Sequence, residues 1–157
     1  MFSQYWFNEA KTNDLLRMEG PLGTFFYRNN PACEEIVLLA TGTGIAPIKA
    51  ILNQWQQQPE QVKGKKIWLL WGGRKKEDLF WQPETTLTNF TYIPVLTRED
   101  EWQGAKGYVQ EIALQQPIHW QKAQVYACGS ELMIQSAQKL LTQQGLKEEN
   151  FFSDAFV

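Results

Sequence analysis

The residues IVLLATGTGIAP, from Ile36 to Pro47, hold the pattern that decides the fold. They open with a short continuous apolar run whose first residues are β-branched, which is typical of a strand buried on both faces of a parallel sheet. Two glycines follow, and Pro47 then stands where the first turn of a helix needs no N–H. The pattern predicts a strand over residues 36–40, a tight turn, and a helix over residues 46–57.

The glycine turn predicts a phosphate-binding site. Gly42 and Gly44 let the backbone turn tightly and approach a ligand, and N–H groups at a helix start favour an anion. The turn is not a G-x-G-x-x-G fingerprint, because Pro47 occupies the third position after Gly44. It is not a Walker A loop either, because Lys49 follows isoleucine and precedes alanine. A glycine-rich turn without a ligand stays open on this stretch alone.

Strand and helix patterns alternate along the rest of the chain. Further strands are predicted at residues 66–71, 90–96, 124–128 and 151–157, and further helices at 76–81, 108–115 and 131–144. Pro94 indicates an edge or a bulge in its strand, and Gly145 provides a helix stop. The alternation predicts an α/β fold with a five-stranded parallel sheet and helices on both faces.

The first thirty residues read differently. They predict a short helix capped by Ser3 and two strands, Leu15–Glu19 and Thr24–Arg28, joined by a glycine-proline turn. We therefore divide the chain into residues 1–30 and an α/β domain over residues 31–157.

The amino-acid composition excludes several classes of ligand and metal site. Fifteen basic and seventeen acidic residues among 157 give a net charge of −2, which disfavours a polycationic surface for nucleic acid or anionic lipid. Cys33, Cys128 and His119 are too few for a four-ligand zinc site or a four-cysteine iron–sulfur cluster, so we expect no metal. No apolar run spans a bilayer and no signal peptide is visible, so we expect a cytoplasmic protein without membrane contact.

Four segments together resemble the NAD(P)-binding half of the ferredoxin–NADP reductase family. They are Thr41–Pro47, similar to its T-G-T-G-x-x-P loop; Trp71–Arg74 followed by Asp78 and Leu79, similar to G-x-R…D-L; Tyr126–Ser130 with Met133, similar to Y-x-C-G-P-x-x-M; and the ending Asp154–Phe156, similar to D-A-F. Ser130 departs from the usual proline of the third segment.

The resemblance implies roles for these residues. It implies a nucleotide site made of Thr41, Gly42, Thr43, Gly44, Pro47, Gly73, Arg74, Arg98, Cys128, Gly129 and Met133. Within it, Arg98 would pair with a 2′-phosphate and Cys128 would orient the nicotinamide, while Phe156 would cover the flavin ring. Core packing of Cys128 and Phe156 and a solvated basic face remain as alternatives, and NADH or NADPH is left open.

The first thirty residues resemble the end of the family's flavin domain. Glu19–Phe25 matches its G-P-x-G-x-F segment, and Ser3 stands where the family has a serine at the flavin pyrophosphate. We expect a remnant of an FAD-binding barrel, with most of the FAD site outside this chain, which would start at an internal Met of a longer reductase. The segments EGPLGTFF and FFSDAF resemble those of the CDP-6-deoxy-3,4-glucoseen reductases.

Two functions follow from the resemblance. The first is an oxidoreductase part that binds NADH or NADPH and passes hydride to FAD, feeding an iron–sulfur protein or another acceptor, with dideoxysugar biosynthesis as one setting. The alternative is a non-catalytic nucleotide-binding module that needs a separate flavin protein. Exposure of Tyr5, Trp6, Phe25 and Phe26 would favour a homodimer.

Overall fold

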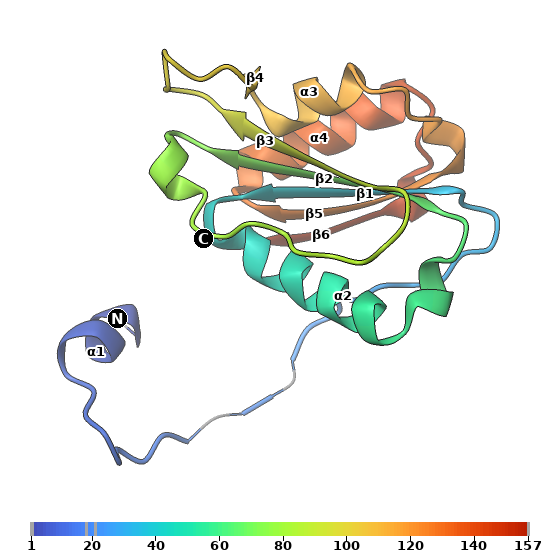
Figure 1. The fold of residues 1–157 in the computed structure, drawn as a ribbon. Coiled ribbons are helices and arrows are strands. Elements are labelled where there is room, and N and C mark those ends of the chain that lie inside the picture. Colours follow the sequence, from blue (N-terminus) through green and yellow to red (C-terminus); the bar gives the residue numbers. More distant parts are fainter. Residues whose placement is uncertain (1, 18, 21, 157) are drawn as a thin grey trace.

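A six-stranded, fully parallel sheet forms the centre of the computed structural model, which describes residues 2–17, 19–20 and 22–156 (Figure 1). The strands are β1 (Glu35–Thr41), β2 (Lys66–Gly73), β3 (Phe90–Leu96), β4 (Ala105–Lys106), β5 (Ala123–Gly129) and β6 (Phe151–Ala155). The five predicted strands are confirmed, and the sixth is the two-residue β4, which pairs only with Val95 and Leu96. The prediction of five strands is corrected to six.

The strand order β4-β3-β2-β1-β5-β6 places β1 in the interior of the sheet. Ala40 near the end of β1 pairs with Trp71 on β2 and with Cys128 on β5. The chain first builds the sheet outward from β1 through β2 and then returns to add β5 on the other side. Such a reversal opens a crevice at the carboxyl ends of the strands.

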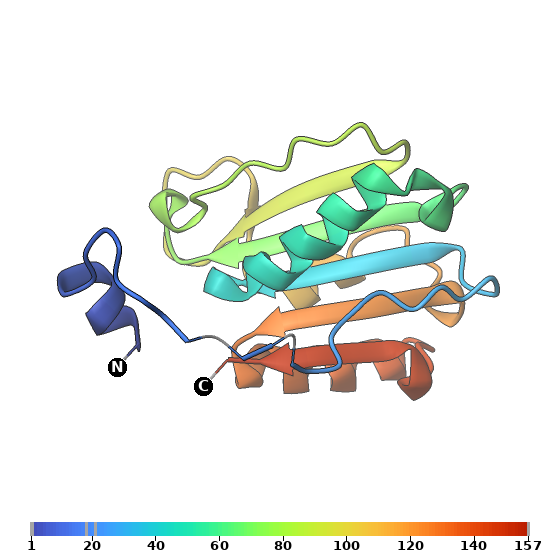
Figure 2. The same ribbon diagram turned by 90° about the horizontal axis from the view of Figure 1, so that it is seen from below.

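Helices cover both faces of the sheet, as predicted (Figures 1 and 2). One face carries α2 (Ile45–Gln57), and the other carries α3 (Val109–Leu114) and α4 (Glu131–Gln143). The helix predicted over residues 76–81 is wrong beyond its first turn, because only a 3-10 turn over Lys76–Asp78 forms. The Asp78 carboxylate accepts the N–H groups of Arg74 and Lys75, which closes this turn on itself.

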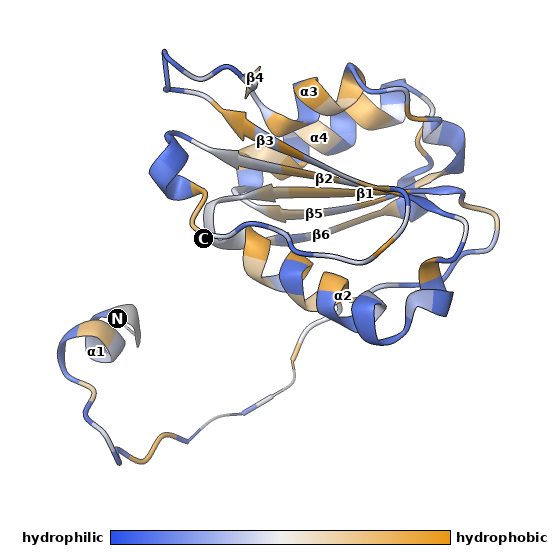
Figure 3. Ribbon diagram, viewed as in Figure 1, coloured by the Kyte–Doolittle hydropathy of each residue, from blue (hydrophilic) through white to orange (hydrophobic). Residues whose placement is uncertain are grey.

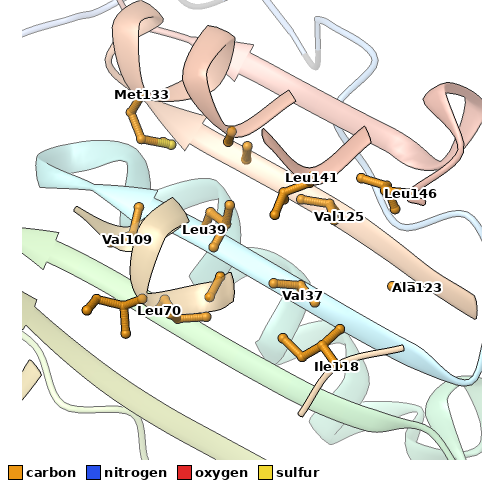
Figure 4. Packing of buried hydrophobic residues seen from close by; sticks show 14 of the residues in the cluster. Val37, Leu39, Leu70, Val109, Ile118, Ala123, Val125, Met133, Leu141 and Leu146 are labelled. Atoms are coloured by element: carbon orange, nitrogen blue, oxygen red, sulfur yellow. The ribbon is translucent and has the colours of Figure 1, made fainter. Parts of the chain in front are cut away.

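Side chains of β1 alternate between two apolar layers. Val37 and Leu39 pack with Val125 and Leu141 beneath α3 and α4 (Figure 4). The intervening Ile36, Leu38 and Ala40 pack against α2 on the opposite face. Because both layers exclude water, β1 is apolar from Ile36 to Ala40, whereas the helices alternate between hydrophobic and hydrophilic residues (Figure 3).

The segment before the sheet forms one short helix, α1 (Phe2–Asn8), and then an extended chain. The helix includes Ser3 in its first turn, so Ser3 is not its cap, and the side chains of Phe2 and Ser3 lie outside the description. The predicted strands Leu15–Glu19 and Thr24–Arg28 are wrong, since the described residues there form no strand. Their side chains suit a strand, but no neighbouring strand supplies the ladder of hydrogen bonds.

The last part of this segment packs on the α/β domain and runs beside β5 and β6 (Figure 2). Tyr27 is buried, and its ring meets Trp55 of α2 edge-on at 5.0 Å. Phe25 likewise packs on Tyr126, while Phe26 stays exposed. This packing crosses the predicted boundary at residue 30, and the division into two domains stays a prediction. None of the described helices has both the length and the apolarity needed to cross a bilayer.

Candidate nucleotide-binding groove

A groove of about 1100 Å³ runs along the carboxyl edge of the sheet. Residues that end or follow β1, β2, β3, β5 and β6 line it, together with the first turns of α3 and α4. The carboxyl ends of parallel strands meet at one edge, so short loops from all these strands converge there. The groove is large enough for a drug-sized or larger ligand.

The glycine turn lies in the middle of the groove. Thr41, Gly42 and Thr43 line it, and α2 begins directly after the turn. Gly42 has φ +52°, a conformation that favours glycine, and open space surrounds it. Gly44 is instead buried against β5, so closely that a Cβ there would clash with the carbonyl group of Cys128. The first glycine therefore allows the turn, and the second allows the close approach of the turn to β5.

The end of β5 is joined to this turn by a hydrogen bond. The Ser130 N–H donates to Thr41 Oγ1 at 3.1 Å, and Gly129 at φ +139° leaves room for the Thr41 side chain. Ser130 Oγ accepts the Met133 N–H at 3.4 Å and caps α4. Ser130, which departs from the family pattern, is thus the N-cap of α4. The amino ends of α4 and α2 both face the groove.

The side of the groove at β2 and β3 carries two arginines together with the carboxylates of Glu77 and Asp78. The Arg98 N–H donates to the Arg74 carbonyl at 2.8 Å, so two arginines separated in sequence become neighbours, and both line the groove exposed. Hydrogen bonds from the N–H groups of Lys75 and then Arg74 hold the pKa of the Asp78 carboxyl below its usual range. The charged Asp78 carboxylate thus fixes the loop that presents Arg74.

Exposed apolar side chains mark both ends of the groove. Among the described residues from Tyr27 onward, those large apolar side chains found exposed are Phe80, Tyr108, Leu132 and Phe156, and all of them line the groove. Phe80 lies beside β2, and Phe156 follows β6. Large apolar surface gathered in one cleft is typical of a binding site for aromatic rings.

Gln110 belongs to the groove, although no motif indicated it. Its side chain is 5% exposed, and its Nε2 donates to Ser136 Oγ at 3.2 Å across α3 and α4. Its Oε1 is buried without a hydrogen-bond partner. Buried acceptors are almost always paired, so this oxygen is available to a donor on a ligand.

The predicted site residues divide into two groups. Those that line the groove are Thr41, Gly42, Thr43, Gly73, Arg74, Arg98, Gly129, Met133 and Phe156. Gly44, Pro47 and Cys128 do not line it: Gly44 and Cys128 are buried, and Pro47 is half-buried in the first turn of α2. Burial raises the pKa of the Cys128 thiol to about 12, so the group is a neutral thiol. Its contact with nicotinamide, like every assigned role, stays a prediction, and the Ser3 side chain lies outside the described residues.

Metal ligands do not gather anywhere in the described part of the chain, where no cluster of three or more His, Cys, Asp or Glu side chains could hold an ion.

Comparison with known proteins places this groove in context. The family model described as oxidoreductase NAD-binding domain matches residues 38–139, which include the glycine turn, both arginines and the amino end of α4. The CDP-6-deoxy-L-threo-D-glycero-4-hexulose-3-dehydrase reductase of Yersinia pestis is 38% identical over 159 residues, covering 100% of this chain and 48% of the relative. Protein RfbI of Salmonella typhimurium is 35% identical, covering 96% and 46%. The chain thus spans about half the length of these curated relatives.

Solved structures share the fold at low identity. The flavohem-like FAD/NAD binding domain of nitric oxide dioxygenase from Vibrio cholerae matches with a TM-score of 0.77 and 20% identity, covering 98% of this chain and 63% of that one. A ferredoxin NADP+ reductase from Neisseria gonorrhoeae with bound FAD and NADP matches with a TM-score of 0.66 and 19% identity, covering 85% and 61%. These matches confirm the predicted fold class.

Proposed function

The chain belongs to the oxidoreductase NAD-binding domain family, and we propose from this premise that its groove holds NADH or NADPH for hydride transfer to a flavin. The order of surfaces along the groove carries this proposal. Arginines and aromatic rings lie at the β2–β3 end, the glycine turn lies in the middle, and apolar residues lie at the β5–β6 end. A dinucleotide has the same order: an adenosine with its phosphate, a diphosphate, and a nicotinamide.

The residues present fit such a ligand. The N–H groups of the turn at Gly42 and Thr43, with the amino ends of α2 and α4, would hold the diphosphate. Arg74 and Arg98 would hold the adenosine side, and the unpartnered Gln110 Oε1 would accept a hydrogen bond from a ligand hydroxyl or amino group.

At the β5–β6 end the chain positions the reacting ring. Met133 and Phe156 supply apolar surface there, which excludes water from the nicotinamide. When bound, the reduced nicotinamide supplies a hydride, and the protein supplies position and electrostatics. Cys128 lies buried near the carboxyl end of β5, and its role in orienting the nicotinamide ring stays a prediction.

The acceptor belongs to the same proposal. Most of the FAD site would lie in protein beyond this chain. The flavin would then pass electrons to an iron–sulfur protein or another acceptor. The Yersinia pestis relative bears the name of a reductase for a CDP-hexulose dehydrase, which supports a role in dideoxysugar biosynthesis. A cytoplasmic location and a homodimer through the N-terminal segment remain predictions.

Titration of NADH and NADPH tests the proposal. We expect the unaltered chain to bind both, and Arg74→Ala or Arg98→Ala to weaken binding about tenfold through loss of a charge-assisted hydrogen bond. A larger loss for NADPH would assign the arginine to a 2′-phosphate. The exposed Arg17, remote in sequence from the groove residues, provides the control Arg17→Ala. Equal affinities in every variant would refute the assignment.

Absorbance after FAD addition distinguishes the two functions. A chain that takes up FAD and oxidises NADH supports the oxidoreductase part, whereas a colourless chain that binds only nucleotide supports the module that needs a separate flavin protein.

A further inference from the structure

Trp71 is fully buried in β2, yet its indole ring reaches the glycine turn that follows β1. We propose that Trp71 is a positioning residue for the diphosphate: its indole N–H holds the Gly42 carbonyl and thereby aims the Thr43 N–H into the groove. The proposal rests on the proposed function, because it assigns a role to the same groove.

The Gly42 carbonyl accepts two hydrogen bonds. Trp71 Nε1 donates to it at 3.1 Å, and the N–H of Ile45, at the start of α2, donates to it as well. Trp71 is paired in register with Ala40 of β1, so its ring stands beside the strand that leads directly into the turn. The carbonyl is therefore held from the adjacent strand and from the helix at once.

Fixing this carbonyl fixes the next N–H. In a trans peptide, the C=O and N–H bonds point in opposite directions. The Gly42 carbonyl points toward Trp71 in the core, so the Thr43 N–H points away from it, and both residues line the groove. The first N–H groups of a helical segment have no partner within it, which leaves the Thr43 N–H for an anion.

The turn needs such a hold because glycine permits other orientations. Gly42 has φ +52°, and nothing lies within 4 Å of the position where a Cβ would stand. Rotation of the Gly42–Thr43 peptide would turn a carbonyl oxygen toward the groove in place of an N–H donor. An oxygen there would repel a phosphate, so the indole bond favours the binding orientation.

The Trp71 ring is itself held by neighbours near the groove. Phe80, which lines the groove, meets the Trp71 ring edge-on, with the ring centroids 5.1 Å apart. The Trp81 ring packs on Trp71 with a centroid distance of 6.4 Å, and the Lys49 ammonium lies over the Trp81 ring. These contacts involve the ring faces and edges and would persist with a phenyl ring. The packing of Trp71 and its hydrogen bond can therefore be separated by substitution.

Trp71→Phe makes this separation, because it keeps an aromatic ring and removes the N–H. We expect the Kd for ADP, which contains the diphosphate, to rise about fivefold, which corresponds to the loss of one neutral hydrogen bond. The Kd for adenosine, which has no phosphate, should stay unchanged. Chemical-shift titration of 15N-labelled protein measures both.

Trp68→Phe is the matched control. Trp68 lies on the same strand, and its indole N–H donates to Glu35 Oε2 at 2.9 Å, at the amino end of the sheet away from the groove. This variant should also lose an indole hydrogen bond, here to a carboxyl oxygen, and keep the affinity of the unaltered chain for both ligands.

Each other outcome overturns the proposal. An equal loss for ADP and adenosine in Trp71→Phe would show a merely structural role, and no loss would show no role. If Trp71→Phe does not fold, the unaltered chain decides: the Trp71 indole proton should exchange slowly, and the Thr43 amide should shift with ADP but not with adenosine. A rapidly exchanging indole or a silent Thr43 amide contradicts the proposal. Failure of the unaltered chain to bind ADP and NADH would instead overturn the proposed function itself.

Discussion

The two glycines of the turn solve different problems at the scale of single residues, and substitution should reveal this. Gly42→Ala meets no atoms but must hold a positive φ, which costs about 1–2 kcal/mol. Gly44 has an ordinary φ of −58°, but a Cβ there would clash with the Cys128 carbonyl. We expect Gly44→Ala to lower the free energy of unfolding more, by about 3 kcal/mol, as overpacking does. Urea unfolding measures both.

Gly42→Asn provides the control for this pair. Asparagine tolerates positive φ better than alanine, so Gly42→Asn should recover part of the stability lost in Gly42→Ala. A Gly44→Ala protein as stable as the unaltered chain would mean that the turn does not approach β5 as closely as described.

Sequence motifs predicted only part of this site, because a motif contains residues that are adjacent in the chain. Thr41, Gly42 and Thr43 stand in one stretch whose backbone makes the site, so the sequence alone indicated them. Gln110 and Trp71 act through partners on other elements: Gln110 through Ser136 on α4, and Trp71 through Gly42 after β1. Such roles depend on tertiary packing. Trp71 stands at the start of one of the quoted segments, but nothing in the neighbouring sequence of either residue indicates its partner.

Helices and strands were predictable where the spacing of their own apolar residues determined them. The strands of the sheet interior are continuous apolar runs because both faces are covered, and α4 shows helical spacing with a stop at Gly145. The failures are elements whose existence depends on a neighbour. The described residues of Leu15–Glu19 and Thr24–Arg28 are strand-like in type but pair with no strand, and β4 exists only where Val95 and Leu96 offer hydrogen bonds.

Arg28 holds the extended segment on the sheet. Its guanidinium lies over the rings of Phe26 at 4.3 Å and Phe152 at 4.6 Å, and it donates to the carbonyls of Thr24 and Phe26. We expect Arg28→Ala to lower the free energy of unfolding by about 1–2 kcal/mol, from lost cation–π contacts and hydrogen bonds. Chymotrypsin should cut at Phe25 and Phe26 faster in this variant.

The exposed Arg17 supplies the comparison, because Arg17→Ala removes an exposed guanidinium from the same segment. Its cleavage rate should match that of the unaltered chain. Equal cleavage of Arg28→Ala and the unaltered chain would mean that the Arg28 side chain does not hold the segment. The aromatic contacts of Phe25 and Tyr27, with the backbone hydrogen bonds of residue 28 to Tyr126 and Gln124, would then suffice.

Over the whole molecule, buried polar groups differ between the two edges of the sheet. At the amino edge, Glu35 accepts the indole N–H of Trp68 and the His119 N–H, and Lys65 donates to the carbonyls of Asn30 and Cys33. At the carboxyl edge, Gln110 keeps an unpartnered oxygen beside the groove. Gln124 Oε1, near the amino end of β5, is also buried without a hydrogen-bond partner, so it is the position of Gln110 beside the groove that links its oxygen to a ligand.

Three phenols and one thiol, all buried or half-buried, set an upper pH limit for the stability of the whole fold. Burial raises the pKa of Tyr27, Tyr92 and Tyr126 to about 12, and that of the Cys128 thiol also to about 12. The unfolded chain has values near 10 for tyrosine and about 8.5–9 for cysteine. The folded state therefore binds these protons more tightly. The stability that they contribute is complete below about pH 8, where the unfolded thiol begins to ionise, and declines as the pH rises toward 12.

Urea midpoints should consequently change little on this account up to about pH 8, decline slightly as the thiol of the unfolded chain ionises, and fall steeply between pH 10 and pH 12. Phenolate absorbance at 295 nm should rise as the chain unfolds. Tyr92→Phe separates this cause from others. Desolvation alone raises the Tyr92 pKa, so a phenyl ring removes the titrating group and keeps the packed ring. The variant should lose less stability than the unaltered chain between pH 9 and pH 11.5. If both chains lose the same stability, or phenolate forms while the fold stays intact, ionisation of these buried groups does not limit the fold.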